Sequence, residues 1–515
     1  MSSIMKKSLI ILSMLAAGFV SANATTYYYK GLASGDGKFD VLENWYTDAT
    51  LTSPATSLPT SADDIVFGAG TVAKNTIRLD AGNSVSKNPE FNSITVTKEA
   101  TSGLTFVNWV SANKNESLTT KGNFTIEAVE SASREVYVKS AAKDSYLDVS
   151  IGGNLSIGNG NTAKFGFIKN QYSECALNTF SVGTAGNANT GNVYVTATDK
   201  DTWLYIAANS RFDKDASNPD INIMGKLYMS SGEKLAYATF LGGNAWAGVD
   251  YIIDRTIFAN IGGLQGKGAF YATNIASRDS ATDKTSLLTI NLAIANNTSN
   301  SKFVGTFSSI ANNVKNGTIT LNKEDVEFNI TKTGAYKQEI SILDGGFYTN
   351  VNNITIKEGE LALHNPASSG SFGAITIEDG ALGVASANGG DSQIGELNAD
   401  SITWNGGTIN IDINDYAVDI INVESFTKGS ADTFKFIFTE GDDKIVEDNA
   451  YTILSTLNTD FVSEDFTAEI DGYNAVFNME DGILSVTFTA VPEPATIACI
   501  FGVLSLAFVA YRRRK

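Results

Sequence analysis

Histidine and cysteine are scarce in this 515-residue chain, and their scarcity excludes several kinds of functional site. His364 is the one histidine, so a metal site with two histidines is excluded. A Cys/His zinc site and a Ser–His–Asp triad are both disfavoured, because each needs more of these residues than the chain supplies or depends on this one histidine. Of the two cysteines, Cys499 lies in an apolar C-terminal stretch, which leaves Cys175 alone and excludes an intramolecular disulfide in the body of the chain. We expect His364 to lie where a strand ends in a turn, in a structural or solvent-exposed position.

Basic residues are also few, 37 against 56 acidic ones. Residues 1–24 hold two lysines and residues 491–515 hold four cations and one glutamate, so the body between them carries 31 cations and 55 anions, a net charge of −24. This balance disfavours binding to DNA or to an anionic membrane surface, so we expect no nucleic-acid partner. It suits solubility, and it could attract divalent cations or basic partners.

The sequence contains no catalytic motif that stands out from its composition. Acidic residues gather in expected turns such as 442–443, where carboxylates usually face solvent, and no serine lies in a G-x-S-x-G elbow. The Asp213-Lys214-Asp215 spacing could bind calcium, but no glycine or terminal glutamate completes that loop pattern. The glycine-rich stretch 262–268 lacks the Lys-Ser/Thr pair of a phosphate loop. We therefore expect no enzymatic activity, no metal and no cofactor.

Aromatic side chains are the remaining candidates for a binding surface, because a flat ring can stack on a sugar. The candidates are Tyr27–Tyr29, Trp109, Trp203 and Trp246. Core packing or stacking against one another is the simpler expectation for all of them. Trp45, near the N-terminus, is also expected in the core.

The N-terminal residues resemble an export signal. Lys6–Lys7 form a basic region, Ser8–Val20 is mostly apolar, and small residues at Ala22 and Ala24 form a cleavage site for signal peptidase. The mature chain would then begin at Thr25. An uncleaved N-terminal anchor is the alternative, which the short apolar stretch disfavours.

A short pattern recurs along the body of the chain: turn residues followed by an apolar–polar–apolar triplet. Alternation of this kind has the period of a half-buried strand, and the preceding Gly or Asn supplies turn conformations. The triplets are Ile94–Val96, Phe124–Ile126, Leu155–Ile157, Val193–Val195, Ile354–Ile356, Ile375–Ile377 and Ile402–Trp404.

The spacing of these triplets predicts the fold class. The first four begin 30, 31 and 38 residues apart, and the last three begin 21 and 27 residues apart. Such spacings in a strand-rich chain without helical periodicity predict stacked coils, an all-β parallel β-helix or β-solenoid with capping strands at both ends. A series of β-sandwiches is the alternative, but it favours strands every 8 to 12 residues.

The last residues form a distinct segment. Two prolines keep the junction Val491, Pro492, Glu493 and Pro494 extended. An uncharged stretch from Ala495 to Tyr511 is at the short end of what spans a bilayer, and a basic end follows at Arg512, Arg513, Arg514 and Lys515. This arrangement resembles the PEP-CTERM sorting signal of bacterial surface proteins. The resemblance implies a single transmembrane helix and processing at the Pro-Glu-Pro motif by an exosortase-type enzyme.

The body resembles the passenger of proteins with the autotransporter-associated β-strand repeat. Ser301–Phe307 matches its F-x-G-T-x element, Ile354–Leu361 and Ile375–Leu382 are copies of one strand–glycine–strand pattern, and Trp404–Asn410 is similar to its G-G-T-L element. Residues 262–268 resemble the glycine-rich coil that introduces such a repeat. In these proteins the opening glycines, the Asn-Trp pair and the D-x-V-x-F strand cap the first turn.

These observations predict five segments: a signal peptide (1–24), an N-terminal cap with the first turns (25–90), β-helix repeats (91–425), a C-terminal β cap (426–490) and the sorting segment (491–515). The expected function is that of an exported structural or adhesin-like protein of the cell surface or extracellular matrix. It would be held in the membrane by its C-terminal helix before processing. The alternative is a β-helix that binds or degrades extracellular polysaccharide.

Overall fold

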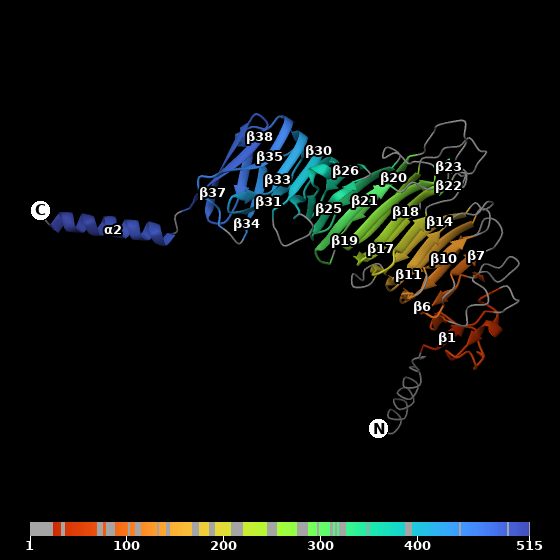
Figure 1. Cartoon of the computed structure of the whole chain (residues 1–515). Helices are drawn as coiled ribbons and strands as arrows, with labels where there is room; N and C mark the ends of the chain where they lie inside the picture. The colour runs from red at the N-terminus through yellow and green to blue at the C-terminus, as the bar shows by residue number, and fades with distance from the viewer. Residues whose placement is uncertain are drawn as a thin grey trace, which may run out of the picture.

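A computed structural model of the chain shows a long coil of β-strands (Figure 1). Among the described residues, thirty-six strands join in one mostly parallel sheet. The predicted all-β, solenoid-like fold is therefore confirmed, whereas an antiparallel β-sandwich does not fit the pairing. The residues that the structure describes are 24–31, 37–68, 76–78, 88–100, 103–108, 115–130, 133–140, 145–166, 175–184, 191–207, 220–244, 255–275, 287–295, 298–309, 313–314, 317–318, 326–347, 350–386, 394–441, 444–491 and 494–513.

One side of the coil, the first side, runs the whole length of the molecule as a column of parallel strands. Its strands are β1 (Thr26–Tyr29), β3 (Asp64–Phe67), β6 (Ser93–Val96), β9 (Phe124–Ile126), β12 (Leu155–Ile157), β15 (Val193–Ala197), parts of β17 (Asp220–Ser231) and β19 (Arg255–Ile275), β21 (Ser301–Ser309), β25 (Gln338–Phe347), β27 (Glu360–His364), β29 (Ala381–Val384), β31 (Thr408–Asn414), β34 (Phe434–Glu440) and β36 (Phe466–Glu469).

The second side is shorter and belongs to the N-terminal half. It contains β4 (Thr76–Arg78), β7 (Leu104–Asn108), β10 (Arg134–Ser140), β13 (Asn161–Gly166), β16 (Thr202–Ala207), β18 (Ala236–Asn244) and the last parts of β19 and β21.

The third side again follows most of the chain. It contains β5 (Glu90–Phe91), β8 (Asn115–Thr120), β11 (Ser145–Ile151), β14 (Cys175–Val182), parts of β17 and β19, β20 (Leu288–Ile294), β24 (Val326–Lys332), β26 (Asn350–Ile356), β28 (Phe372–Ile377), β30 (Glu396–Trp404), β33 (Ile420–Lys428) and β35 (Ala450–Thr459).

The number of strands per turn falls along the chain, and this explains the shorter spacing toward the C-terminus. Early turns use all three sides. From β26 onward the described parallel strands alternate between the third and first sides alone, as β26, β27, β28, β29, β30 and β31 do. A turn without a second-side strand needs fewer residues, so the triplets at 354, 375 and 402 lie closer together than those at 94, 124, 155 and 193.

The interior is a continuous stack of apolar side chains. The triplets predicted from the sequence pair directly: Ile94 lies opposite Phe124, Phe124 opposite Leu155, and Leu155 opposite Val193. All four side chains are buried in one hydrophobic cluster that extends through the described length of the coil. Since each turn covers the apolar face of its neighbours, the turns stabilise one another in the manner of a repeat protein.

Antiparallel strands cover both ends of the coil. At the N-terminal end, β2 (Trp45–Tyr46) pairs with β1, and the buried Trp45 ring packs edge-on against Tyr29 with 5.1 Å between ring centroids. At the other end, β38 (Ile483–Ala490) pairs with β35, and β37 (Tyr473–Glu480) pairs with β38. Covered ends limit pairing with strands of other molecules.

The remaining elements are short or peripheral. β22 (Asn313–Val314) and β23 (Gly317–Thr318) form a separate hairpin, and β32 (Ala417–Val418) pairs with β31. Single 3-10 turns span Leu42–Asn44, Ala367–Ser369 and Ser463–Asp465, and one helix, α2, spans Pro494–Arg513. Within the described residues, no helix combines the length and hydropathy needed to cross a membrane, so the predicted transmembrane helix is not found.

Residues 262–268 are not the coil that the sequence predicts; they lie inside strand β19. Leu264 is buried in the core, and at Gly266 the backbone has φ +92. A Cβ atom on Gly266 would overlap the carbonyl oxygen of Met229 on the neighbouring turn. The glycines therefore permit β19 to bend from the first side to the second while lying close to the preceding turn.

Candidate functional site

The C-terminal segment is the first of three candidate sites. Val491 follows the last strand directly, and its backbone N–H donates to the Gly472 carbonyl at 2.8 Å. Pro494 begins α2, and Arg512 and Arg513 lie in its last turn. Other predicted processing residues, namely Ala22, Pro492, Glu493, Arg514 and Lys515, lie outside the described residues, and Ala24 is an exposed residue two positions before β1.

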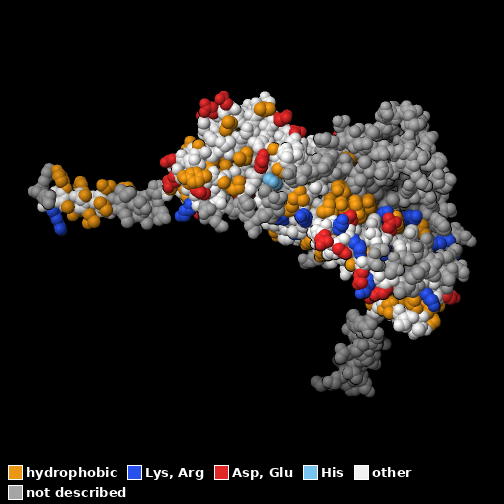
Figure 2. Space-filling model, in the orientation of Figure 1, with side chains coloured by type: hydrophobic (Ala, Val, Ile, Leu, Met, Phe, Trp, Pro, Cys, Tyr) orange, Lys and Arg blue, Asp and Glu red, His pale blue; other side chains and the backbone are white. Residues whose placement is uncertain are grey.

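Helix α2 presents large apolar side chains to solvent. From residue 501 to 513 every side chain is exposed, including Phe501 at 65% and Leu506 at 71%. Figure 2 shows hydrophobic side chains along this helix and basic side chains near its end. Contiguous apolar surface of this kind marks a site of interaction with another apolar surface.

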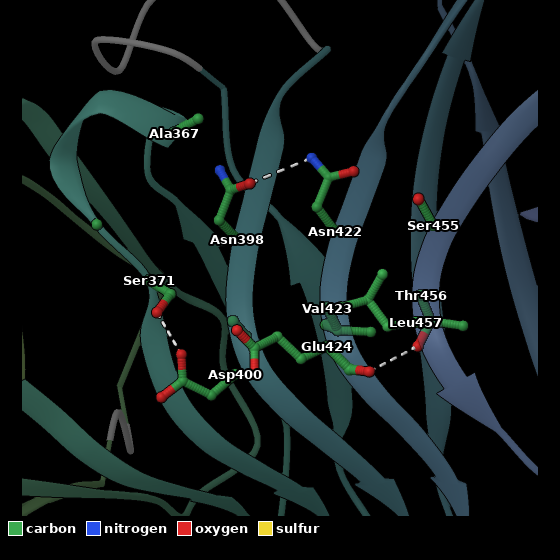
Figure 3. Close-up of a pocket in the computed structure, with 12 residues that line it drawn as sticks. Ala367, Ser371, Asn398, Asp400, Asn422, Val423, Glu424, Ser455, Thr456 and Leu457 are labelled. Carbon is green, nitrogen blue, oxygen red and sulfur yellow. Dashed lines mark hydrogen bonds between the residues drawn. The ribbon is translucent and has the colours of Figure 1, made fainter. Parts of the chain in front are cut away.

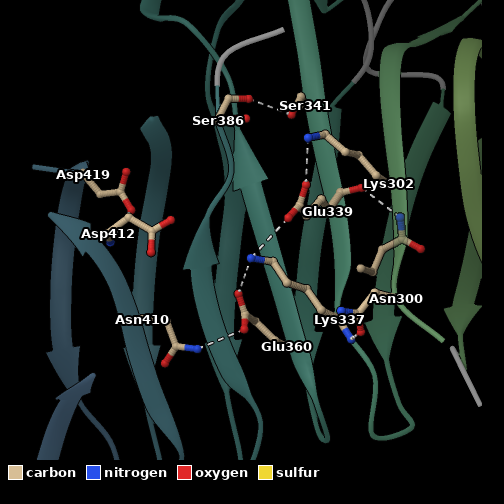
Figure 4. Close-up of polar contacts among 11 residues, drawn as sticks. Asn300, Lys302, Lys337, Glu339, Ser341, Glu360, Ser386, Asn410, Asp412 and Asp419 are labelled. Carbon is tan, nitrogen blue, oxygen red and sulfur yellow. Dashed lines mark hydrogen bonds and ion pairs between the residues drawn. The ribbon is translucent and has the colours of Figure 1, made fainter. Parts of the chain in front are cut away.

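The second candidate is a network of charges on the outer surface of the first side (Figure 4). Lys337 Nζ lies 2.9 Å from Glu360 Oε1 and 3.2 Å from Glu339 Oε1, and Lys302 Nζ lies 3.4 Å from Glu339 Oε2. Asn410 Nδ2 donates to Glu360 Oε2 at 3.0 Å. Burial disfavours the charge of Lys337, but Glu360 and Glu339 outweigh it and raise the pKa of Lys337.

The position of Glu360 depends on a glycine in the next turn. A Cβ atom on Gly383 would lie 2.6 Å from Glu360 Oε1, so the carboxylate rests directly on the Gly383 backbone. Glu360 thereby reaches from β27 across β29 to Asn410 on β31. The network joins four turns, through β21, β25, β27 and β31, and both carboxylate oxygens of Glu360 have partners. These contacts favour a structural role over proton transfer.

Two aspartates beside this network have raised pKa values. Burial raises the pKa of Asp412, and burial raises the pKa of Asp419 to about 8. Asp419 is fully buried, and its two oxygens accept hydrogen bonds from the backbone N–H groups of Gly395 (2.6 Å) and Asp412 (2.8 Å). These bonds hold the turn between β31 and β33. Among the described residues, no group of three or more His, Cys, Asp or Glu side chains could hold a metal ion.

The third candidate is a groove of about 370 Å³ on the third side, near the C-terminal end (Figure 3). It crosses β30, β33 and β35. Each of these strands has two successive residues that are at least partly exposed, and the three pairs lie opposite one another in the register of the sheet. The pairs are Asp400–Ser401, Glu424–Ser425 and Leu457–Asn458. Such an interruption of the alternation bends a strand, as a β-bulge does, and its repetition in three neighbouring turns produces the groove.

The groove is lined by amides, hydroxyls and carboxylates. Asn422 Nδ2 donates to Asn398 Oδ1 at 3.2 Å, and the Ser371 hydroxyl donates to the Asp400 carboxylate. These residues were not predicted from the sequence. The signal was present in Leu397-Asn398-Ala399 and Ile421-Asn422-Val423, which place an asparagine at one register position of successive turns.

His364 is not part of any of these sites. As predicted, it ends a strand, β27, before a turn, and it is buried rather than solvent-exposed. Its Nδ1 accepts a hydrogen bond from the Glu396 backbone N–H at 3.2 Å, and burial lowers the pKa of His364. A neutral imidazole with this partner has a structural role.

Among the described aromatic candidates, Tyr27, Tyr29, Trp45 and Trp203 lie in the core or stack on another aromatic ring, as expected, and Tyr28 is half-buried. Tyr27, Tyr29 and Trp45 are buried. Trp203 is stacked on Tyr237 of the next turn with 3.7 Å between ring centroids and 7° between planes. Stacking covers the ring face that a sugar would need, so this pair is a poor sugar platform. Trp109 and Trp246 lie outside the described residues.

Comparisons with known proteins do not assign the chain to a family: no protein-family model matches it, and no curated protein is similar to it. The functional proposal therefore depends on the arrangement of the three candidate sites.

Proposed function

We propose that this chain is an exported structural or adhesin-like protein of the cell surface or extracellular matrix, and that residues 491–515 direct its sorting. The observation that carries the proposal is the apolar helix α2, which follows a solenoid whose two ends are covered. An export signal over residues 1–24, removed by signal peptidase, is part of this proposal.

The solenoid supports a structural role through its core and its ends. One hydrophobic cluster runs through the described turns, so each turn is stabilised by its neighbours. Strands β2 and β38 cover the terminal turns. A long, edge-protected stack of this kind suits a stiff stalk or an extended adhesive surface, and the charge of the body keeps it soluble.

The position of the sorting motif supports processing by an exosortase-type enzyme. Val491 is half-exposed and lies immediately after β38, so a cut between residues 491 and 494 removes no strand from the solenoid. The two prolines favour an extended, accessible backbone there. We propose that α2 associates with a lipid surface before the cut, with Arg512 and Arg513 at the polar boundary.

Deletion of residues 491–515 tests this proposal. The full chain is expected in the envelope or matrix fraction, and the truncated chain is expected to be released into the medium or misrouted. Val476→Ser is a matched control because Val476 is an exposed apolar residue of β37 outside the tail. A truncated chain that stays in the same fraction as the full chain would show that the tail has no sorting role.

A further inference from the structure

We propose that the groove over β30, β33 and β35 binds a neutral polysaccharide, with the sugar chain lying across the strands. The inference goes beyond the proposed sorting and structural role, because it depends on the groove alone. Figure 3 shows the groove residues on neighbouring strands, where Asn398 and Asn422 lie side by side.

The shape of the groove suits an extended polymer. Its volume of about 370 Å³ is within the range of small-ligand sites, and it crosses three neighbouring strands of a parallel sheet. Neighbouring strands lie about 4.8 Å apart, so an asparagine and a carboxylate recur at that interval on β30 (Asn398, Asp400) and β33 (Asn422, Glu424), and β35 places Ser455 and Leu457 at the same positions. Successive rings of an extended β-linked polysaccharide advance by a similar distance, so two successive rings can meet equivalent groups and a third can meet Ser455 and Leu457.

The groove offers hydrogen-bonding groups that are not used elsewhere. Among the described residues, Asn422 Oδ1 and the Glu424 carboxylate accept no hydrogen bond, and the Ser455 hydroxyl has no partner. Sugar hydroxyls can donate to the two acceptors and can exchange hydrogen bonds with the serine. A site with open acceptors at fixed positions favours a ligand rich in hydroxyl groups.

Charge and apolar contact narrow the ligand class. The lining contains the carboxylates of Asp400 and Glu424 and no lysine or arginine, so a uronate, sulfated or phosphorylated polymer would be repelled. Leu457 is 80% exposed at one edge of the groove, whereas Val423 lies buried beneath it. The Leu457 side chain can pack against the C–H face of a pyranose ring. The combination fits a neutral polysaccharide.

Affinity electrophoresis of the full chain, in a non-ionic and sugar-free detergent, tests the inference. Native gels would contain a neutral β-glucan, a neutral N-acetylglucosamine polymer or anionic polygalacturonate. We expect retardation by at least one neutral polymer and none by polygalacturonate. Asn422→Ala, Glu424→Gln and Leu457→Ala are each expected to weaken binding about two- to tenfold, the effect of losing one contact.

The choice of exposed groove residues and one control variant outside the groove distinguish lost binding from lost folding. Leu457 and Glu424 are exposed, so their variants are expected to fold normally. Asn353→Ala changes an asparagine of the same side that bonds to Asn329 outside the groove, and it should leave binding unchanged. The inference is overturned if neither neutral polymer retards the chain, if polygalacturonate retards it equally, or if Asn353→Ala weakens binding as much as the groove variants. Such failure would leave the sorting test unaffected.

Discussion

Replacement of Arg134 by methionine is expected to open the solenoid locally. Arg134 is 1% exposed on β10. Its guanidinium donates four hydrogen bonds to oxygen atoms of three successive turns: Thr97 O (2.6 Å), Ala100 O (2.8 Å), Glu127 O (2.6 Å) and Asn161 Oδ1 (2.8 Å). One side chain therefore joins three layers of the stack.

The size of the effect follows from these contacts. A hydrogen bond to a charged group contributes about 1.5–3 kcal/mol, so four of them outweigh the cost of burying one cation. That cost is visible in the pKa of Arg134, which burial lowers to about 10. Methionine retains apolar volume but removes all four donors. Among the described residues, Thr97 O and Glu127 O keep a second donor, from Ala100 N–H and Asn161 Nδ2, whereas Ala100 O and Asn161 Oδ1 are left without one. Since a buried acceptor without a donor costs about 1–3 kcal/mol, we expect a net loss of about 2–6 kcal/mol in local stability.

Native-state hydrogen exchange read by mass spectrometry measures the loss where it occurs. In a repeat protein each turn is coupled mainly to its neighbours, so protection should fall over β6 to β13 and remain unchanged over β30 to β35. Lys121→Met is the control, since Lys121 forms an exposed ion pair with Glu90 at 3.3 Å, and such pairs contribute about 0–1 kcal/mol. Equal protection in the Arg134 variant and the control would refute the reasoning.

Further predictions concern backbone strain, pH and ring stacking. Gly472→Ala should cost about 1 kcal/mol because φ is +76 with open space around it. Gly407→Ala should cost at least twice as much, because φ is +69 and the new Cβ would overlap the Gly380 carbonyl oxygen of the preceding turn; urea unfolding compares the two variants. Because burial raises the pKa of Asp419 to about 8, the contribution of Asp419 to stability is fully present below about pH 4 and is lost as pH rises through 8; Asp419→Asn should remove this part of the pH dependence in melting curves. Trp203→Leu should lower exchange protection near Tyr237 by roughly 0.5–1.5 kcal/mol, and unchanged protection would show that the stack adds no stability.

The sequence predicted the strands of the core well, for a physical reason. Apolar residues alternate with hydroxyl residues at Ile94–Val96 and Ile375–Ile377, and this period requires one buried face. The preceding turn residues fix where each strand begins. Spacing then predicted stacking, and the structure places Ile354 opposite Ile375 and Ile375 opposite Ile402.

Buried polar residues could not be predicted, because the residues that cover them come in large part from other turns of the coil. Arg134 occupies the first position of a strand that alternates like any half-exposed strand, yet it is buried by three turns. Lys332 is also buried, its Nζ donates to the carbonyls of Thr333, Gly334 and Glu358, and burial lowers the pKa of Lys332 to about 8. Composition suggested only a solvated charged surface.

The groove was missed for a related reason. Each of Asn398, Asn422 and Glu424 is unremarkable in its own segment, and their proximity depends on the register between successive turns. A sequence pattern fixes which face a residue occupies but not which residue of the next turn lies beside it when loop lengths vary.

Mass spectrometry of both termini of the protein recovered from cell-surface and matrix fractions tests the central claim most directly. The account predicts a mature chain that begins at Thr25 and ends within Val491–Pro494, found in those fractions. A chain that retains both Met1 and Lys515 and is recovered from the cell interior would contradict export and sorting together.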